Sequence, residues 1–369
     1  MTNTRLVLII NSLIFSTAIH ANLAQVIKLR GNATYVSNGM REAKKIELNQ
    51  WLNKDSSILT SDKSFLVLRY KTGSEVTLGP NSKIIVDTGV KEDQQLVNLL
   101  VGKFKASVKN QAKTNDNKMI IKTLGAAMGV RGTEFQAGYN PQTKITTLLT
   151  YHGAVAMTQL PEVKSAPQID TAKIEEELSK KAVLVKLGEY SGVSETTKNI
   201  TPPVKISTEQ FTKLKLNETL GAVDEKVDEK KYQQELEKTT KDYTQVKSEA
   251  ISEIRPGGFV DNETGIYLPP PKSSEFDKEL SIYKAPEKMG KVDDAGNYIP
   301  PVGVKLDAEK GFVIDEQKVS IEAKNIINEL KTEVEKQVEK KEEIIIKKKK
   351  NLENKEEDVY KKYYDPNSL

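Results

Sequence analysis

Between residues 23 and 159 apolar side chains recur at every second position, and this periodicity constrains the fold more than any other feature of the sequence. In one run, Phe104, Ala106 and Val108 alternate with charged or small polar residues. Strands with one buried and one solvated face produce this spacing, whereas an amphipathic helix repeats every 3.6 residues. Gly, Pro and Asn residues divide the runs into short segments. The pattern predicts a mainly β domain over residues 22–160, built as a sandwich, a roll or a solenoid.

The composition excludes most kinds of chemical site. The 369 residues include no Cys and only two His, His20 and His152. Without Cys there is no disulfide, thiol nucleophile or cysteine-bound zinc, and two His residues almost exclude a histidine triad or a multi-histidine metal site. The net charge of +4 is too small to indicate a nucleic-acid partner. We therefore expect no catalytic residue, no metal site and no small-molecule cofactor.

The first 21 residues have the three-part pattern of a secretory signal peptide. A short polar start with one basic residue, Arg5, precedes an apolar segment at residues 6–15, and small residues follow. This segment is shorter than the about 20 residues that a bilayer-spanning helix needs. The pattern predicts cleavage after Ala21 and export to the periplasm, the cell surface or the medium. An uncleaved signal anchor is the alternative.

Three strings in the β region are specific enough to suggest a relationship. They occupy residues 72–82 (TGSEVTLGPNS), 99–108 (LLVGKFKASV) and 129–135 (GVRGTEF). In this order and spacing they resemble the FecR domain, the periplasmic module named after the iron-dicitrate sensor FecR. The resemblance covers about residues 23–160 and implies an all-β module that binds other proteins rather than converting a substrate.

The best-known members of that family are anti-sigma regulators in which a cytoplasmic segment and a membrane span precede the FecR domain. In this chain only five residues stand before the hydrophobic segment. We therefore expect no segment that holds a sigma factor, and transmembrane signalling of the usual kind is not the first expectation.

The third string combines a structural motif with two charged residues. Gly129 and Gly132 permit a positive φ or a close approach of two backbone segments. Arg131 and Glu134 could pair within the corner, or Arg131 could contact a partner directly, since its guanidinium suits a carboxylate or several carbonyls. We take Arg131 and Glu134 as candidate binding residues. The structural part of the motif is Gly129, Gly132, Thr133 and Phe135.

Beyond the β domain the sequence predicts helices and spacers. Residues 161–206 read as a short helix, a closing strand and a Pro-rich junction. Ser207 and Gln210 form a possible capping box at the start of a long charged helix over residues 207–251. Its thin apolar stripe suits a solvated spacer and a partner-binding helix equally well.

Residues 252–315 contain an internal repeat. Residues 258–270 and 290–301 are two copies, and residues 304–314 are a degenerate third. Each copy predicts a short β-hairpin with Asp at the start of its turn and Gly at the end. Tyr267 and Tyr298, each followed by prolines, are candidate contacts for a peptide or a glycan, with packing within the turn as the alternative. The acidic residues of the turns also suggest calcium binding, although their spacing matches no known calcium loop.

The C-terminal residues 316–363 have the composition of a helix or coiled coil. An imperfect heptad stripe makes self-association possible, and the basic run at residues 347–350 could touch an anionic polymer or lipid head groups.

Three functions remain open. The first is an exported, non-enzymatic binding or scaffold protein that engages a protein or an envelope component. The alternative is a signal-anchored envelope regulator related to FecR sensors. The third is a hydrolase of wall glycan, which needs two carboxylates about 5 to 10 Å apart that no sequence pattern selects.

Overall fold

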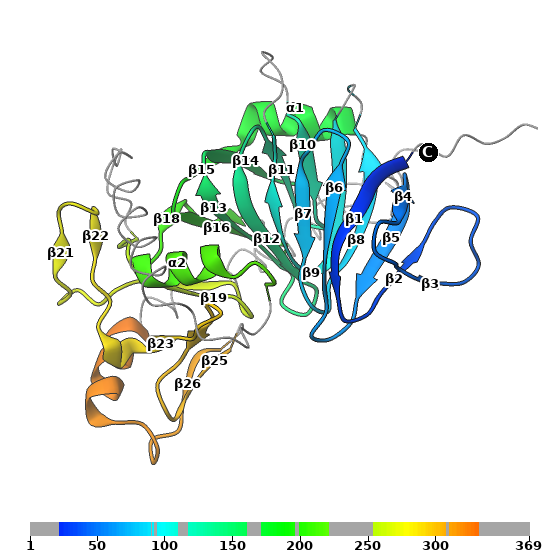
Figure 1. Ribbon diagram of the computed structural model, residues 1–369. Coiled ribbons are helices and arrows are strands. Elements are labelled where there is room, and N and C mark those ends of the chain that lie inside the picture. Colours follow the sequence, from blue (N-terminus) through cyan, green and yellow to red (C-terminus); the bar gives the residue numbers. More distant parts are fainter. Residues whose placement is uncertain are drawn as a thin grey trace, which may run out of the picture.

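The computed structural model describes residues 22–89, 91, 94–109, 117–160, 171–195, 199–220, 254–307 and 310–331. The predicted signal peptide, including Ala21, lies outside the described residues. The described chain forms a two-layer β domain and, after it, a smaller hairpin module at residues 254–331 (Figure 1). Eighteen strands of the β domain form one open sheet that does not close into a barrel.

The first layer of the β domain is entirely antiparallel. Its strands, in spatial order, are β4 (Trp51–Asn53), β1 (Asn22–Arg30), β6 (Phe65–Tyr70), β7 (Glu75–Leu78), the second half of β9 (Gln95–Ser107), β12 (Glu134–Asn140), β13 (Ile145–His152) and β16 (Glu189–Ser194), with β17 (Asn199–Ile200) and β18 (Val204–Lys205) both on β16.

The second layer contains one parallel pair, β9 with β10. In spatial order it holds β3 (Lys44–Lys45), β2 (Ala33–Val36), β5 (Ser56–Thr60), β8 (Lys83–Thr88), the first half of β9, β10 (Met119–Lys122), β11 (Ala126–Val130), β14 (Ala154–Gln159) and β15 (Val183–Lys186).

Strand β9 belongs to both layers. Residues 95–101 pair with β8 and β10 in the second layer, and residues 102–107 pair with β7 and β12 in the first. The strand bends at Gly102, whose φ is +91°, a conformation that residues with a Cβ rarely adopt. A Cβ at this position would also lie 2.1 Å from Ser82 Oγ. The bend therefore requires glycine.

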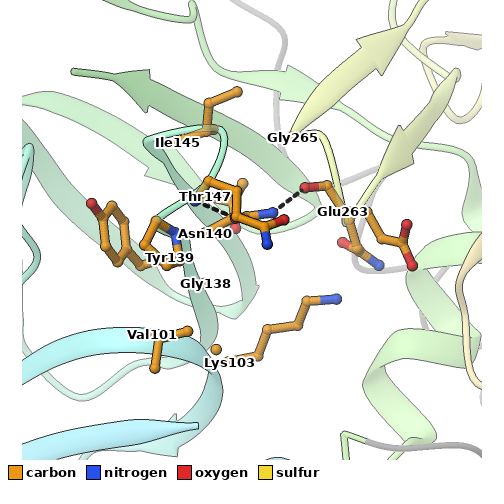
Figure 2. A pocket seen from close by; sticks show the side chains of 13 residues that line it. Val101, Lys103, Gly138, Tyr139, Asn140, Ile145, Thr147, Glu263 and Gly265 are labelled. Carbon is orange, nitrogen blue, oxygen red and sulfur yellow. Dashed lines mark hydrogen bonds between the residues drawn. The ribbon is translucent and has the colours of Figure 1, made fainter. Parts of the chain in front are cut away.

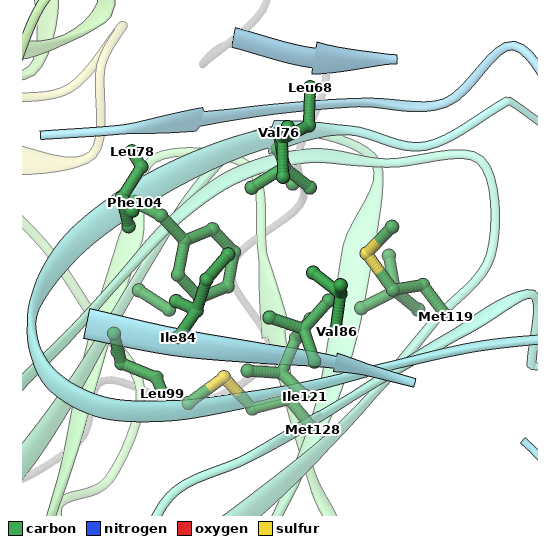
Figure 3. Packing of buried hydrophobic residues seen from close by; sticks show 14 of the residues in the cluster. Leu68, Val76, Leu78, Ile84, Val86, Leu99, Phe104, Met119, Ile121 and Met128 are labelled. Carbon is green, nitrogen blue, oxygen red and sulfur yellow. The ribbon is translucent and has the colours of Figure 1, made fainter. Parts of the chain in front are cut away.

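The main core lies between the two layers. Phe104 of β9 and Phe135 of β12 are fully buried and meet edge to face, with ring centroids 5.9 Å apart. Figure 3 shows side chains of the two layers, such as Leu68 and Ile121, pointing toward one another. The two-residue periodicity of the sequence correctly predicts this buried face.

Each layer is covered on its outer face by a helix. Helix α1 (Thr171–Lys181) packs on the second layer through Ile174 and Leu178. Helix α2 (Thr208–Leu216) packs on the first layer, where Phe211 lies 5.6 Å from the ring of Tyr151. The prediction of a wet outer face is therefore wrong at Lys105, which is buried, because a segment about a hundred residues later covers it.

The hairpin module contains four hairpins in sequence. They are β19 (Phe259–Asp261) with β20 (Ile266–Leu268), β21 (Phe276–Asp277) with β22 (Ile282–Tyr283), β23 (Lys291–Val292) with β24 (Tyr298–Ile299), and β25 (Val304–Asp307) with β26 (Gly311–Ile314). The second hairpin lies between the two predicted copies, and the repeat pattern does not predict it. A helical turn, η1 (Glu287–Met289), precedes the third.

A shared turn explains the repeat. Asp261, Asp277, Asp293 and Asp307 begin the four turns, and each carboxylate accepts a hydrogen bond from a backbone N–H two to four residues later. The turns end at residues of positive φ, which are Gly265, Ser281, Gly296 and Gly311. Ser281 replaces the expected glycine, which hid the second hairpin.

A small second core holds the module together. Phe259 and Tyr298 stack with their centroids 5.4 Å apart, and the helical residues 321–331 add Ala323, Ile327 and Leu330. The module also contacts the first layer: Tyr267 and Val260 share a cluster with Tyr190 of β16 and Phe211 of α2. Isolated hairpins are marginal in water, so this contact explains how such short ones persist.

The predicted long helices are not found in the described residues. The Ser207 hydroxyl does accept from the Gln210 backbone N–H at 3.2 Å, as predicted, but α2 ends at Leu216 and Asn217 is extended. The prediction of one helix over 207–251 is therefore wrong at residue 217, and residues 221–253 lie outside the described residues. The last helix begins at 321, not 316, because residues 315–319 form a turn around Asp315. The coiled coil lies mostly beyond residue 331, outside the described residues.

Candidate functional site

The third string of the sequence forms the corner between β11 and β12. Gly132 has a φ of +62°, and a Cβ on Gly129 would lie 2.7 Å from the amide nitrogen of Asn117. Thr133 is buried, with its hydroxyl 3.2 Å from the carbonyls of both Arg131 and Ala154. Phe135 belongs to the main core. The glycines therefore serve the positive φ and the close approach that the sequence predicts.

The two charged residues of the corner do not pair. Arg131 is exposed, and its Nε donates to Asn117 Oδ1 at 3.2 Å. Glu134 is half-buried and forms no ion pair with any described residue. The expected Arg131–Glu134 pairing is therefore wrong, whereas the solvent exposure of Arg131 leaves a partner contact as an untested expectation.

The two candidate tyrosines are buried rather than exposed. Tyr267 is 2% exposed, and its hydroxyl donates to the Arg255 carbonyl at 2.8 Å. Tyr298 is 6% exposed and donates to the Met289 carbonyl at 2.6 Å. Burial raises the pKa of both hydroxyls above the ordinary tyrosine value. Packing, the alternative interpretation, accounts for both rings: Tyr298 lies in the core of the module, and Tyr267 lies in the contact between the module and the β domain. The four candidate residues do not form one site.

A pocket of about 380 Å³ lies where the first hairpin meets the β domain. Its wall combines the bend of β9, the end of β12, the turn before β13 and the turn between β19 and β20 (Figure 2). The hairpin is held there by two hydrogen bonds: Asn140 Nδ2 donates to the Glu263 carbonyl at 2.8 Å, and the Tyr190 hydroxyl donates to the Gly265 carbonyl at 2.7 Å. A Cβ on Gly265 would lie 2.5 Å from Ile145 Cγ2, so the close seat of the turn requires glycine.

Lys103 is the cation of this pocket. It is half-buried and extends from β9 toward the hairpin side of the pocket, which carries Glu263 (Figure 2). Among the described residues its Nζ has neither a hydrogen bond nor an ion pair. Burial lowers the pKa of Lys103, although Glu263, Asp261 and Asp293 act in the opposite direction.

Lys105, two residues further along β9, has the opposite surroundings. Its Nζ donates to the carbonyls of Leu214, Lys215 and Asn217 at 3.1, 2.9 and 3.1 Å. It also lies 4.9 Å from the centre of the Tyr151 ring. A cation at the C-terminal end of a helix satisfies free carbonyls and the helix dipole, so Lys105 fastens α2 to the β domain. Burial lowers its pKa to about 8.

Neither lysine is predicted as a site residue from the sequence. They lie in one of the strings that carry the family resemblance, but their alternation with Phe104 and Ala106 marked them as solvated. They differ from solvated lysines only because α2 and the first hairpin, which come much later in the chain, cover this face. Within the described ranges, no group of three or more His, Asp or Glu side chains is placed to hold a metal ion. No described helix is long and apolar enough to cross a bilayer.

Comparison with known proteins agrees with the resemblance seen in the sequence. Residues 56–156 match the family model described as FecR protein. A search of curated proteins gives no match.

Among solved structures, the chain is similar to two crystal structures of a protein from Parabacteroides distasonis ATCC 8503 that is provisionally described as an anti-sigma factor. Each has 16% sequence identity and a TM-score of 0.29, and the match covers 39% of this chain and 57% of that one. The chain thus spans little more than half the length of those structures. Residues 56–156 are therefore similar to the FecR family, in agreement with the three strings that suggest the relationship in the sequence.

Proposed function

We propose that this chain is a non-enzymatic regulator of the FecR type that acts in the cell envelope by contacting another protein. The FecR match over residues 56–156 carries the proposal. The crystal structures similar to this chain are described as an anti-sigma factor, a class that works through protein contacts.

The arrangement of the two regions supports regulation by contact. The outer face of the first layer is occupied by α2 and the first hairpin of the same chain, which bury Tyr151 and Tyr190. The pocket beside Lys103 opens at the seam between these regions. A partner that binds at this seam touches both regions at once, so its binding is coupled to their contact.

Deletion of the gene, followed by genome-wide transcript measurement, tests the regulator. We expect a discrete set of transcripts to change and to return when the full chain is restored. An unchanged transcript profile would remove the regulator hypothesis. Complementation with the variant Lys71→Gln, which removes one exposed charge, should restore the transcripts as well as the unaltered chain does.

Photo-crosslinking then identifies the surface. A crosslinking residue at exposed Gln142, on the rim of the pocket, is expected to capture one discrete protein. The same residue at exposed Glu47 is the control. Equal capture from both positions would argue against the seam as the contact surface.

An exported binding or scaffold protein is the second candidate. The tandem hairpins favour it, because repeats of one small unit commonly build extended binding surfaces. The N-terminal sequence of the protein in cell fractions separates the candidates. A start at Asn22 in a soluble extracytoplasmic fraction supports the scaffold, whereas an intact Met1 in the membrane fraction supports an anchored regulator.

A further inference from the structure

Two hydrogen-bond donors in the pocket have no acceptor. Lys103 Nζ has no partner among the described residues, although Lys105 on the same strand has three. Asn262 Nδ2, on the hairpin turn that lines the same pocket, is buried and likewise has no hydrogen-bond partner in the described part of the chain. A buried amide donor without an acceptor is uncommon and costly. Asn262 Nδ2 is such a donor, and Lys103 lines the same pocket, so the pocket offers an amide and an ammonium group to a ligand.

The carboxylates of the neighbouring turns do not supply that acceptor. Asp261 accepts from Thr264 and from the Glu263 backbone within its own turn. Asp293 accepts from the backbone N–H and the side-chain amide of Asn297, at 2.7 and 3.0 Å. Neither these two nor Glu263 forms an ion pair with Lys103. Among the described residues, therefore, no carboxylate bonds to the ammonium group of this pocket-lining lysine.

The size of the pocket limits what can enter. Its volume of about 380 Å³ is at the lower end of the roughly 300–1,000 Å³ range of small-ligand pockets. Val101 and Ile145 contribute apolar wall next to Lys103. A short segment with a charged end and an apolar body suits such a wall, whereas a folded domain does not enter it.

We propose that the pocket binds a carboxylate-bearing ligand of about dipeptide size, with the carboxylate at Lys103 Nζ and the amide of Asn262 beside it. A carboxylate accepts a charge-assisted hydrogen bond from an ammonium group and can accept a second bond from an amide. The proposal rests on the proposed function, because the C-terminus of a partner protein presents this group. A free dicarboxylate is the other source of the same chemistry.

Binding to the full chain tests the proposal directly. The probes are N-acetyl-dialanine with a free carboxylate, the same peptide as its amide, and succinate, each titrated by calorimetry or ligand-observed NMR up to about 10 mM. We expect the free acid to bind at least tenfold more tightly than the amide. Tighter binding of N-acetyl-dialanine than of succinate assigns the site to a chain end, and the reverse order assigns it to a small carboxylate.

Variants locate the binding at the pocket. Lys103→Gln is expected to weaken the binding of the free-acid peptide at least tenfold, and Asn262→Ala severalfold. Lys71→Gln should leave this affinity unchanged. Retained fluorescence of the single Trp, Trp51, checks the β domain of each variant, and hydrogen exchange over residues 254–331 checks the hairpin module. The proposal is overturned if neither acid binds saturably, if acid and amide bind equally, or if Lys103→Gln binds as the unaltered chain does. These probes need no partner, so their failure is distinct from an unchanged transcript profile.

Discussion

The two-layer domain and the hairpin module are held together by different means. The domain buries long alternating strands, and its core runs continuously from β1 to β16. The module has strands of two to four residues, and their order comes from Asp-capped turns, a small core and contact with the domain. One region is therefore stabilised mainly by buried area, and the other by turn geometry and by its neighbour.

The largest test of this comparison is Phe135→Ala in the domain core. Loss of a fully buried aromatic ring that meets Phe104 should cost about 3–5 kcal/mol. Because the module is stabilised by its contact with the domain, we expect both regions to lose stability together. Trp51 fluorescence follows the domain in urea, and hydrogen exchange follows residues 254–331. A module that keeps its protection while the domain unfolds would show that it stands alone.

Tyr298→Ala is the reverse experiment. The ring stacks on Phe259 and its hydroxyl bonds to the Met289 carbonyl, so its loss should destabilise the module by about 3 kcal/mol. The Trp51 transition of the domain should stay within about 0.5 kcal/mol of its original value. An equal shift of the Trp51 transition would mean that the two regions unfold as one unit.

Lys105→Met tests the connection between the two regions. Three helix-end carbonyls lose a charged donor, and we expect a cost of about 2 kcal/mol. The loss should show as faster amide exchange in α2, with the inner strands unaffected. Lys71→Met, at an exposed turn position, is the matched control. Unchanged exchange in α2 would mean that its apolar face alone holds it.

The pH dependence of stability gives a finer test of the same lysine. The pKa of Lys105 is about 8 in the folded chain, against 10.5 for an ordinary lysine. Between these values the unfolded chain binds more protons, so stability should rise as the pH increases from about 8 toward 10, by about 1–2 kcal/mol. Above about pH 10 the trend should reverse, because burial raises the pKa of Tyr190 and Tyr267 and only the unfolded chain ionises there.

Urea denaturation between pH 7 and pH 11 measures this profile. The Lys105→Met variant should lose most of the increase in stability between about pH 8 and pH 10, and it should keep the decrease above about pH 10. A rise that survives in the variant would come from Lys103, Lys122 or Lys205, since burial lowers the pKa of each of them as well.

Ser281→Gly should give the smallest effect, and it is a gain. Ser281 has a φ of +55° in the second hairpin, where the other three turns have glycine. Glycine adopts this conformation without strain, so we expect about 0.5–1 kcal/mol of added stability in the module. Gly265→Ala, at the matching position of the first hairpin, should lose stability. A loss in both variants would contradict the turn-based account of the module.

The sequence predicts well whatever depends on neighbouring residues. The alternation around Phe104, the corner at Gly132 and the cap at Ser207 all follow from short-range patterns. The burial of Tyr267 and of Lys105 does not, since each is covered by residues far away in the chain. The candidate pocket belongs to the second kind, because β9 and the first hairpin are some 160 residues apart and no local pattern joins them.

The single bent strand β9 has a mechanical consequence. A pull that separates the two layers acts along the covalent backbone through Gly102, as well as on the weaker contacts between side chains. The layers can slide or separate at their free edges, but β9 is one continuous strand that belongs to both layers and connects them covalently. Force applied to this domain would therefore separate the layers from their edges inward, and the contact with the hairpin module, on the outer face, would break before β9 does.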